Sequence, residues 1–319
     1  MSTHSEKNWE GFWLNTSEPA AYRGGAPQEE VLNRFWCRFF STALPEQAPV
    51  DLLDIACGNG IVSAIALQIM EEKKLPQSAV FGLDQSLSAL KSLAARSSHV
   101  RGVLANAAVP PFRRGVFHLV VSQFGLEYAG LDAFGNVGGL LRPGGVFAAV
   151  IHLKEGAMFR ECRVNRTAVL ALDETGFFKH SRAVFLPGRS TVAARRGLEQ
   201  FQQALSGVDG ILQAHGTGVA GGTVKRLRAD VLRMYQNRSA YSREEVINWI
   251  GGMRKELLAY AGRMSAMLDA AMDEQDMQAL EKLLAAGGLR LEVREPMNAS
   301  VTGENVAWAL VAEKSDKAK

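Results

Sequence analysis

From residue 50 the chain alternates short apolar runs of strand length with stretches of helical periodicity, and this alternation constrains the fold more than any other feature. The apolar runs expected as strands cover residues 50–55, 79–83, 102–105, 117–122 and 145–153. Strands that alternate with helices form parallel sheets covered by helices on both faces. The sequence therefore predicts an α/β fold with a doubly wound, mostly parallel sheet.

The segments on either side of this core, residues 50–153, have other patterns. Residues 1–49 are expected to form an N-terminal helical cap, because six apolar residues recur there at helical spacing: Val31, Leu32, Phe35, Trp36, Phe39 and Phe40. Residues 154–286 contain several helical patterns and little strand pattern, so they are predicted to form a helical insertion that caps the substrate. Residues 287–319 are expected to supply the last strands of the core sheet, over 289–294 and 306–311.

Composition narrows the class of protein. The chain has 319 residues, of which 47% are hydrophobic and 22% charged, as in globular proteins. Three cysteines lie far apart and do not form the close pairs of a zinc site, so no metal is expected. A secretory signal and a membrane-spanning run are not evident, which predicts a cytoplasmic protein. The net charge of +3 is too small to imply nucleic acid by itself.

Residues 51–60, Asp-Leu-Leu-Asp-Ile-Ala-Cys-Gly-Asn-Gly, predict a strand, a tight turn and the start of a helix. Gly58 and Gly60 remove side chains between the backbone and a ligand, and the helix N-terminus faces that ligand. Asp54 places a carboxylate close to the turn. An anion there suits a ligand that carries an ammonium and a sulfonium better than it suits a pyrophosphate.

The second expected strand ends in Phe81-Gly-Leu-Asp84, followed by Gln85 and Ser86. A carboxylate at this position can accept hydrogen bonds from two ribose hydroxyls. The alternative is an exposed aspartate at a strand end. Because Asp54 and the glycines also favour such a ligand, the nucleoside interpretation is preferred.

These stretches, with three later ones, resemble the class I S-adenosylmethionine-dependent methyltransferases. The resemblance covers about residues 50–153, and its later elements are Leu104-Ala-Asn106-Ala107, Val109-Pro-Pro-Phe112 before residues 117–122, and Leu141-Arg-Pro-Gly-Gly145. It implies a Rossmann-like sheet with an antiparallel last strand and S-adenosyl-L-methionine as cofactor. The cofactor-binding residues that it implies are Asp54, Ala56, Cys57, Gly58, Gly60, Asp84, Gln85, Asn106, Ala107, Ser122 and Gln123.

The chain departs from the family pattern at three positions. Ala56 replaces a glycine, and Asn106 replaces an aspartate but keeps an amide oxygen that can accept from an adenine amine. His118 stands where the fourth strand commonly begins with aspartate, and we expect a structural difference there rather than a catalyst. None of these changes removes the cofactor site.

The resemblance implies in-line displacement of the sulfonium methyl group by an acceptor. Glu127, Tyr128 and His152 are the candidates for acid–base chemistry or acceptor contact, with an ion pair for Glu127 and a structural histidine for His152 as the alternatives. Four N-terminal aromatic residues are candidates for a lid over the site, with ordinary packing as the alternative: Trp9, Phe12, Trp13 and Tyr22.

Three features of the insertion leave interpretations open. Residues 216–221 read G-x-G-x-x-G but follow no strand pattern, so a loop is expected. The apolar face of the helix after residue 242, rich in methionine, either packs internally or forms an adaptable substrate wall. Eight basic residues are either a solvated face or a surface that attracts an anion: Arg182, Arg189, Arg195, Arg196, Lys225, Arg226, Arg228 and Arg233.

The predicted partner is accordingly a small-molecule methyl acceptor, anionic or apolar. A nucleic-acid methyltransferase that uses the basic insertion is ranked lower, because aromatic residues interleaved with those arginines are sparse. A non-catalytic partner protein with the same fold is the third hypothesis. The acceptor atom and the oligomeric state, a homodimer included, stay open.

Overall fold

The computed structural model describes residues 9–14, 25–186, 190–299 and 303–315; for residues 25–27 only the backbone is described. The chain divides into two compact units. The first unit comprises residues 1–160 and 266–319, and the second comprises residues 161–265.

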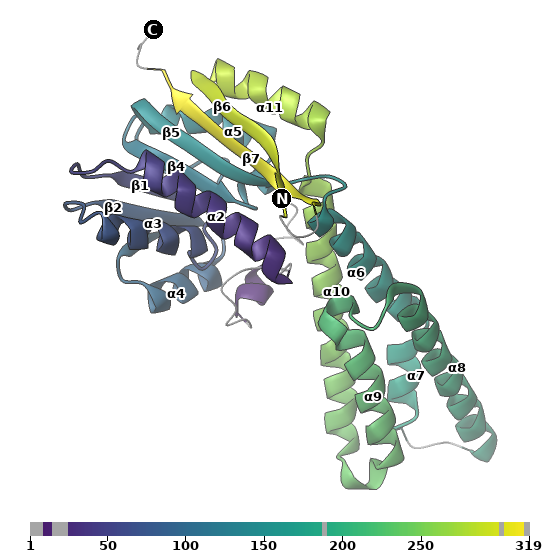
Figure 1. Ribbon diagram of the computed structural model, residues 1–319. Coiled ribbons are helices and arrows are strands. Elements are labelled where there is room, and N and C mark those ends of the chain that lie inside the picture. The colour runs from purple at the N-terminus through teal and green to yellow at the C-terminus, as the bar shows by residue number, and fades with distance from the viewer. Residues whose placement is uncertain (1–8, 15–24, 187–189, 300–302, 316–319) are drawn as a thin grey trace. The chain divides into compact units, whose positions relative to one another are not determined.

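The first unit contains one seven-stranded sheet in the order β3-β2-β1-β4-β5-β7-β6 (Figure 1). Its strands are β1 (Asp51–Ile55), β2 (Ala79–Asp84), β3 (Val100–Leu104), β4 (Phe117–Gln123), β5 (Leu141–His152), β6 (Leu289–Asn298) and β7 (Asn305–Lys314). The first five strands pair in parallel, and β7 pairs antiparallel with both β5 and β6. The predicted fold class, a mostly parallel doubly wound sheet with an antiparallel last strand, is confirmed.

Two strands begin earlier than expected, and β6 and β7 extend past their expected ends to Asn298 and Lys314. The third strand begins at Val100, because Val100 already pairs with Val80. The fifth strand begins at Leu141, which pairs with Phe117 before a register shift in the ladder. The stretch Leu141-Arg-Pro-Gly-Gly145 therefore forms an irregularity within this strand, and Gly144 has φ of +67° there.

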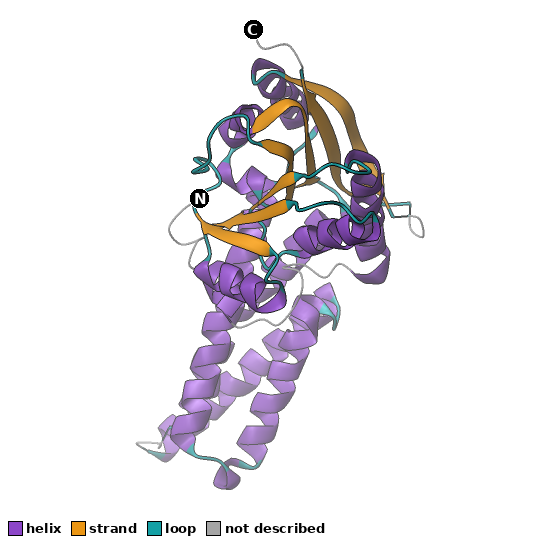
Figure 2. Cartoon of the chain, turned by 90° about the vertical axis from the view of Figure 1, so that its left-hand side faces the viewer, coloured by secondary structure: helices purple, strands orange, loops and turns teal. Residues whose placement is uncertain are grey.

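Helices flank the sheet, which Figure 2 shows in orange. Helices α2 (Gly25–Ala43) and α3 (Ile61–Glu72) pack together, as do α5 (Leu131–Leu140) and α11 (Glu274–Ala286), while α4 (Leu87–Arg96) contacts β2 and β3. The main core joins strands β1, β4, β5 and β7 to apolar residues of α5 and α11, such as Phe134, Met277 and Leu280. Burial of these side chains fixes the sheet and hence the loops at its carboxyl edge.

The described residues of the second unit form helices and connecting turns. Its helices are α6 (Ala157–Glu174), α7 (Phe177–Ala183), α8 (Thr191–His215), α9 (Thr223–Gln236) and α10 (Arg243–Ala270), and the unit boundary falls within α6 and α10. A separate core contains Val246, Ile250 and Leu257 of α10, so this part of the methionine-rich helix packs internally. Helix α11, which was expected in the insertion, packs instead in the core of the first unit.

The G-x-G-x-x-G stretch connects α8 to α9, so the element that leads directly into it is a helix and not a strand. Ala220, at φ of +50°, donates its N–H to Asn165 Oδ1 at 2.9 Å. This stretch is therefore a connection between helices and lacks the strand that a dinucleotide-binding turn requires.

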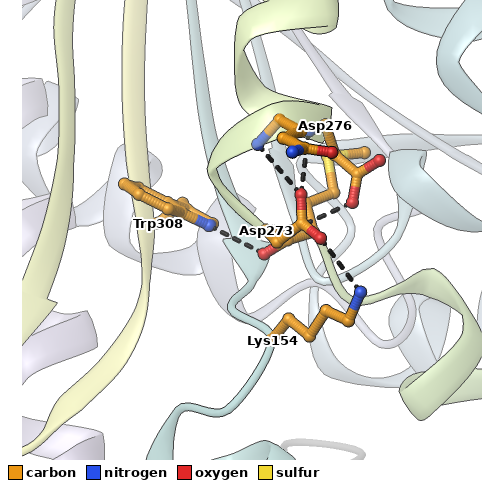
Figure 3. A network of polar contacts seen from close by, with 6 residues as sticks. Lys154, Asp273, Asp276 and Trp308 are labelled. Atoms are coloured by element: carbon orange, nitrogen blue, oxygen red, sulfur yellow. Dashed lines mark hydrogen bonds and ion pairs between the residues drawn. The ribbon is translucent and has the colours of Figure 1, made fainter.

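A polar network ties the end of β5 to the start of α11 (Figure 3). Lys154 Nζ lies 2.9 Å from Asp273 Oδ2, and Asp273 forms a capping box with Asp276. The bond from Lys154 lowers the pKa of Asp273 to about 2. Met272 donates its N–H to the His152 carbonyl at 2.8 Å, and its own carbonyl accepts from Trp308 Nε1 at 3.0 Å. The backbone at His152 is thereby held in place.

Among the helices of the described residues, none is both long enough and apolar enough to cross a bilayer.

Candidate active site

A cavity of about 660 Å³ lies at the carboxyl ends of the parallel strands. Strand β1 is the point where the strand order reverses, because β2 and β3 lie on one side of it and β4 and β5 on the other. Ligands of open α/β sheets bind at such a switch point. The wall includes residues from the loops after β1 to β4 and the last residue of β5, and all of its described residues belong to the first unit.

The loop after β1 has the tight geometry that its glycines allow. Gly58 and Gly60 have φ of +55° and +85°. A Cβ on Gly60 would lie 2.3 Å from Leu93 Cδ1, and one on Gly58 would lie 2.7 Å from Trp13 Cζ2. The chain then enters α3 at Ile61. Ala56, Cys57 and Gly58 line the cavity, whereas Gly60 shapes the loop from behind.

Asp54 does not reach the cavity wall, which corrects the expectation that it meets the ligand directly. Its side chain is buried, and Oδ2 accepts from the Ser63 N–H at 3.2 Å and from Ser63 Oγ at 2.7 Å. Burial raises the pKa of Asp54 to about 7, although the bonds from Ser63 oppose the shift. Asp54 therefore anchors the first turn of α3 beneath the glycine loop.

Asp84 lies at the end of β2 and lines the cavity. Its Oδ2 accepts from the Gly58 N–H and its Oδ1 from the Ser86 N–H, both at 2.8 Å. Burial raises the pKa of Asp84, and these backbone bonds act against that rise. A carboxylate offers about four acceptor positions, so hydroxyl donors from a ribose still fit beside the two backbone bonds.

The loop after β3 supplies Asn106 and Ala107 to the wall. Asn106 Oδ1 accepts from the Ala108 N–H at 2.9 Å, which fixes the side chain and leaves the amide nitrogen as a donor. Leu87 and Leu104 also line the cavity, although 47% and 55% of their surfaces are exposed. Exposed apolar side chains at a cavity favour a flat apolar ligand ring that would cover them.

The three predicted catalytic residues meet at the ends of β4 and β5. Tyr128 Oη lies 3.0 Å from His152 Nε2, and the His152 N–H donates to Glu127 Oε1 at 3.1 Å. The Phe124 ring stacks on the imidazole at 4.4 Å between centroids. Tyr128 and His152 line the cavity, and Glu127 lies behind them.

Burial sets the protonation of this cluster. It lowers the pKa of His152 to about 3, so the imidazole is neutral at physiological pH. It raises the pKa of Glu127 to about 7, against the effect of backbone hydrogen bonds that include the one from His152. Glu127 therefore orients the His152 backbone and is not part of the described cavity wall.

The last two predicted cofactor residues of the β4 region have different positions. Ser122 is buried, donates through Oγ to the Ile55 carbonyl at 2.9 Å and accepts from the Leu126 N–H at 3.2 Å. It joins β1 to the loop after β4 and is not on the cavity wall. Gln123 is on the wall, as is Gln85 after β2.

One face of α2 lines the cavity and was not recognised in the sequence. It presents Glu29, Leu32, Asn33 and Trp36, and Trp36 Nε1 donates to Gln123 Oε1 at 2.6 Å. Their spacing of three and four residues is the signal that could have identified this face. Met267 near the end of α10 also lines the cavity.

The helical residues 9–14 cover part of the site and contact three of its loops. Trp9 packs edge to face on Tyr128 with centroids 5.9 Å apart, and Trp13 lies against Gly58. Glu10 accepts from Ser86 Oγ and Ser88 Oγ, each at 2.5 Å. Burial alone would raise the pKa of Glu10, but these bonds outweigh it and lower the pKa. Tyr22, the fourth lid candidate, lies outside the described residues.

Two other expectations concern residues away from the cavity. His118 Nδ1 accepts from the Asp51 N–H at 3.1 Å, and burial lowers the pKa of His118, so it is a neutral structural residue as expected. Within the described part of the chain, no cluster of histidine, cysteine, aspartate and glutamate could hold a metal ion.

Comparisons with known proteins bear on the sheet domain. Residues 52–145 match the family model described as a methyltransferase domain. Among curated proteins, none matches the chain.

Solved structures give distant matches. One is an S-adenosylmethionine-dependent methyltransferase from Mesorhizobium loti, which is 14% identical over 87% of this chain and 96% of that chain, with a TM-score of 0.42. Another is geranyl diphosphate C-methyltransferase from Streptomyces coelicolor, which is 18% identical over 47% of this chain and 66% of that chain, with a TM-score of 0.34. A chain of a Haloferax volcanii methyltransferase complex is 16% identical over 46% of this chain and 61% of that chain, with a TM-score of 0.35. The chain thus spans less than two thirds of the length of the last two proteins.

The family match covers β1 to the start of β5, which are the strands that carry the cavity loops. The strand order, the glycine loop and the acid at the end of β2 agree with that match. Residues 52–145 are therefore a class I S-adenosylmethionine-dependent methyltransferase domain, and its cofactor is S-adenosylmethionine.

Proposed function

We propose that this protein transfers a methyl group from S-adenosylmethionine to a small-molecule acceptor bound at the carboxyl ends of β4 and β5. The observation that carries the proposal is the continuity of the cavity, whose wall includes both Asp84 and the Tyr128–His152 pair. Because β1 separates β2 from β4 in the sheet, a cofactor over β1, β2 and β3 leaves the half of the cavity at β4 and β5 for an acceptor.

Three groups of residues would hold the cofactor. Loop residues 56–58 would face its amino-acid end, Asp84 its ribose, and Asn106 with Leu104 its base. Bound S-adenosylmethionine supplies a methyl group on a cationic sulfur, and in-line displacement leaves the bonding electron pair on that sulfur.

Tyr128 is the proposed contact for the acceptor. In the Nδ1-protonated tautomer, neutral His152 would accept the Tyr128 hydroxyl hydrogen bond at Nε2, which would turn the oxygen lone pairs of Tyr128 toward an N–H or O–H of the methyl acceptor. Since the pKa of His152 is low, His152 is a weak base, and its role is to position Tyr128. The proton that the methyl acceptor loses passes to solvent. Orientation of the acceptor then provides most of the protein's contribution to the rate.

The size and charge of the site support a small acceptor. A volume of about 660 Å³ lies within the usual range of small-molecule pockets. Among the described residues of its wall there is no lysine or arginine, whereas proteins that hold nucleic-acid backbones rely on such side chains.

We also propose that the N-terminal residues and the insertion cap this site. Contacts from Trp9, Glu10 and Trp13 to three loops support the lid. Of residues 154–286, Met267 is the one that the described cavity wall includes, and it belongs to the first unit.

Two measurements test the proposal. Calorimetric titration with S-adenosylhomocysteine is expected to show saturable one-to-one binding, and a screen of acceptor classes with a labelled methyl donor is expected to yield a methylated small molecule. Tyr128→Phe should preserve cofactor binding and lower turnover by about 10- to 100-fold. The control Tyr241→Phe, at an exposed residue of the second unit, should leave both unchanged. Binding of the cofactor without turnover on any acceptor class would instead support the non-catalytic alternative.

A further inference from the structure

The half of the cavity at β4 and β5 has a distinctive composition. Its wall contains Trp9, Trp36, Gln123, Phe124, Tyr128 and His152, which we term the acceptor wall. Trp9 belongs to it through its ring contact with Tyr128, and Trp36 through its bond to Gln123. Five of these six side chains are aromatic rings.

Four side chains of the acceptor wall form two polar pairs, whereas the buried Trp9 Nε1 has no hydrogen-bond partner among the described residues. Trp36 Nε1 donates to Gln123 Oε1 at 2.6 Å, and Tyr128 Oη lies 3.0 Å from His152 Nε2. His152 stays neutral because burial lowers its pKa to about 3. The acceptor wall therefore carries no formal charge at physiological pH.

The charges of the cavity lie elsewhere. Asp84 is the last residue of β2, and the Glu10 carboxylate is bound to Ser86 and Ser88 at the start of α4. Glu29 is the third carboxylate of the described wall, which contains no lysine or arginine. An anion that enters the acceptor half would lose its hydration and meet no cationic side chain among these residues.

Resting on the proposed function, we infer that the acceptor is an uncharged molecule with an aromatic or apolar body and a hydroxyl or neutral amine, and that carboxylates and phosphates are excluded. The partly exposed rings of Trp9, Phe124 and Tyr128 favour such a body. Gln123 and Tyr128 provide polar contacts for its single polar group. The basic residues of the insertion then have no role in binding an anionic acceptor in this cavity.

Matched aromatic probes test this inference. Benzyl alcohol, benzoate and phenyl phosphate have similar bodies and differ in charge. Each is titrated into the full chain saturated with S-adenosylhomocysteine, which lacks the sulfonium charge, and binding is followed by ligand-observed NMR. Ligands of this size bind at millimolar concentration. Benzyl alcohol is expected to bind at least about tenfold more tightly than either anion.

A charge introduced beside the acceptor wall provides the second arm. Ala129 lines the cavity and is partly buried. Ala129→Lys should raise the affinity for benzoate by about tenfold or more, while Ala129→Gln, of similar length and no charge, should not. Retained binding of S-adenosylhomocysteine shows that both variants fold.

The outcomes separate the two proposals. If wild-type protein does not bind S-adenosylhomocysteine, the proposed function fails. If S-adenosylhomocysteine binds but benzoate binds as well as benzyl alcohol, or no probe binds, the inferred acceptor class is wrong. If Ala129→Lys leaves benzoate binding unchanged, the acceptor wall does not border the probe site, and the inference is again overturned.

Discussion

Removing the Glu10 carboxylate should open the lid that residues 9–14 form over the cavity. Glu10 accepts from Ser86 Oγ and Ser88 Oγ at 2.5 Å, and weaker bonds run from the Ser88 N–H at 3.2 Å and 3.4 Å. These bonds attach the segment to the start of α4, where the Ser86 N–H also donates to Asp84. Glu10→Ala removes all of them and leaves Trp9 and Trp13 in place.

The expected size of the effect follows from the number of bonds and their exposure. Hydrogen bonds to a charged group stabilise by about 1.5–3 kcal/mol when buried, but Glu10 is only partly buried, and solvent screening reduces the value. Two hydroxyl bonds then contribute roughly 1–2 kcal/mol to closure. Such a loss should speed dissociation of S-adenosylhomocysteine by about 5- to 30-fold.

Stopped-flow displacement from the full chain measures this rate. Glu30→Ala is a matched control, because Glu30 is exposed and pairs on the helix surface with Arg34. Ser88→Ala should also speed dissociation, and the double variant Glu10→Ala with Ser88→Ala should show less than the product of the single effects. Because the pKa of Glu10 is lowered, its contribution should be complete above its ordinary pKa of 4.5 and be lost as the pH falls below it. Dissociation rates that do not differ between Glu10→Ala and Glu30→Ala would refute this role of the lid.

Two further predictions concern residues behind the cavity. The folded protein protonates Glu127 up to about pH 7 and the unfolded chain only up to about pH 4.5, so Glu127 lowers the free energy of unfolding as the pH rises between these values. Asp54, whose pKa is also raised to about 7, contributes to the same slope. Glu127→Gln should therefore reduce the total change by about 1–3 kcal/mol in urea unfolding at a series of pH values, and slopes identical to those of the wild type would show that Glu127 is ionised throughout. Gly60→Ala should lower the free energy of unfolding by about 1–3 kcal/mol, because the position has φ of +85° and a Cβ would contact Leu93. The control Gly115→Ala, at φ of +70° with open space around it, should lower the free energy of unfolding by less. Equal losses in the two variants would exclude the contact with Leu93 as a cause.

The sheet domain was predictable because local patterns there agree with the tertiary structure. Strand-length apolar runs become buried parallel strands, and the glycines after β1 adopt the left-handed conformations that a tight turn requires. The extent of the insertion was less predictable. Helix α11 has an ordinary amphipathic sequence, and the assignment of its apolar face to the sheet core depends on tertiary contacts with α5.

The site was predictable where function depends on position at a strand end. Asp84, Asn106, Gln123, Tyr128 and His152 all reach the cavity, since the carboxyl ends of parallel strands meet at one edge. Asp54 also lies near a strand end, but the sequence does not show that its carboxylate turns inward to Ser63.

Other residues of the site depend on how separate segments dock. Glu10 reaches Ser86 and Ser88 across more than seventy residues of chain, and the pattern of residues 9–14 contains no sign of that contact. In the sequence Trp36 is only one member of an apolar helical pattern; in the structure it is buried, and its indole N–H also fixes Gln123 at the cavity.

The most direct test of the central claim is calorimetric titration of S-adenosylhomocysteine into wild-type protein and Asp84→Asn, with Asp132→Asn on the exposed first turn of α5 as control. One-to-one binding to the wild type and to Asp132→Asn is expected, with affinity at least about tenfold weaker in Asp84→Asn, since an amide lacks the charge and half of the acceptor capacity that ribose hydroxyls would use. Absence of binding to the wild type, or equal affinity in all three proteins, would contradict a cofactor site at the ends of β1 and β2.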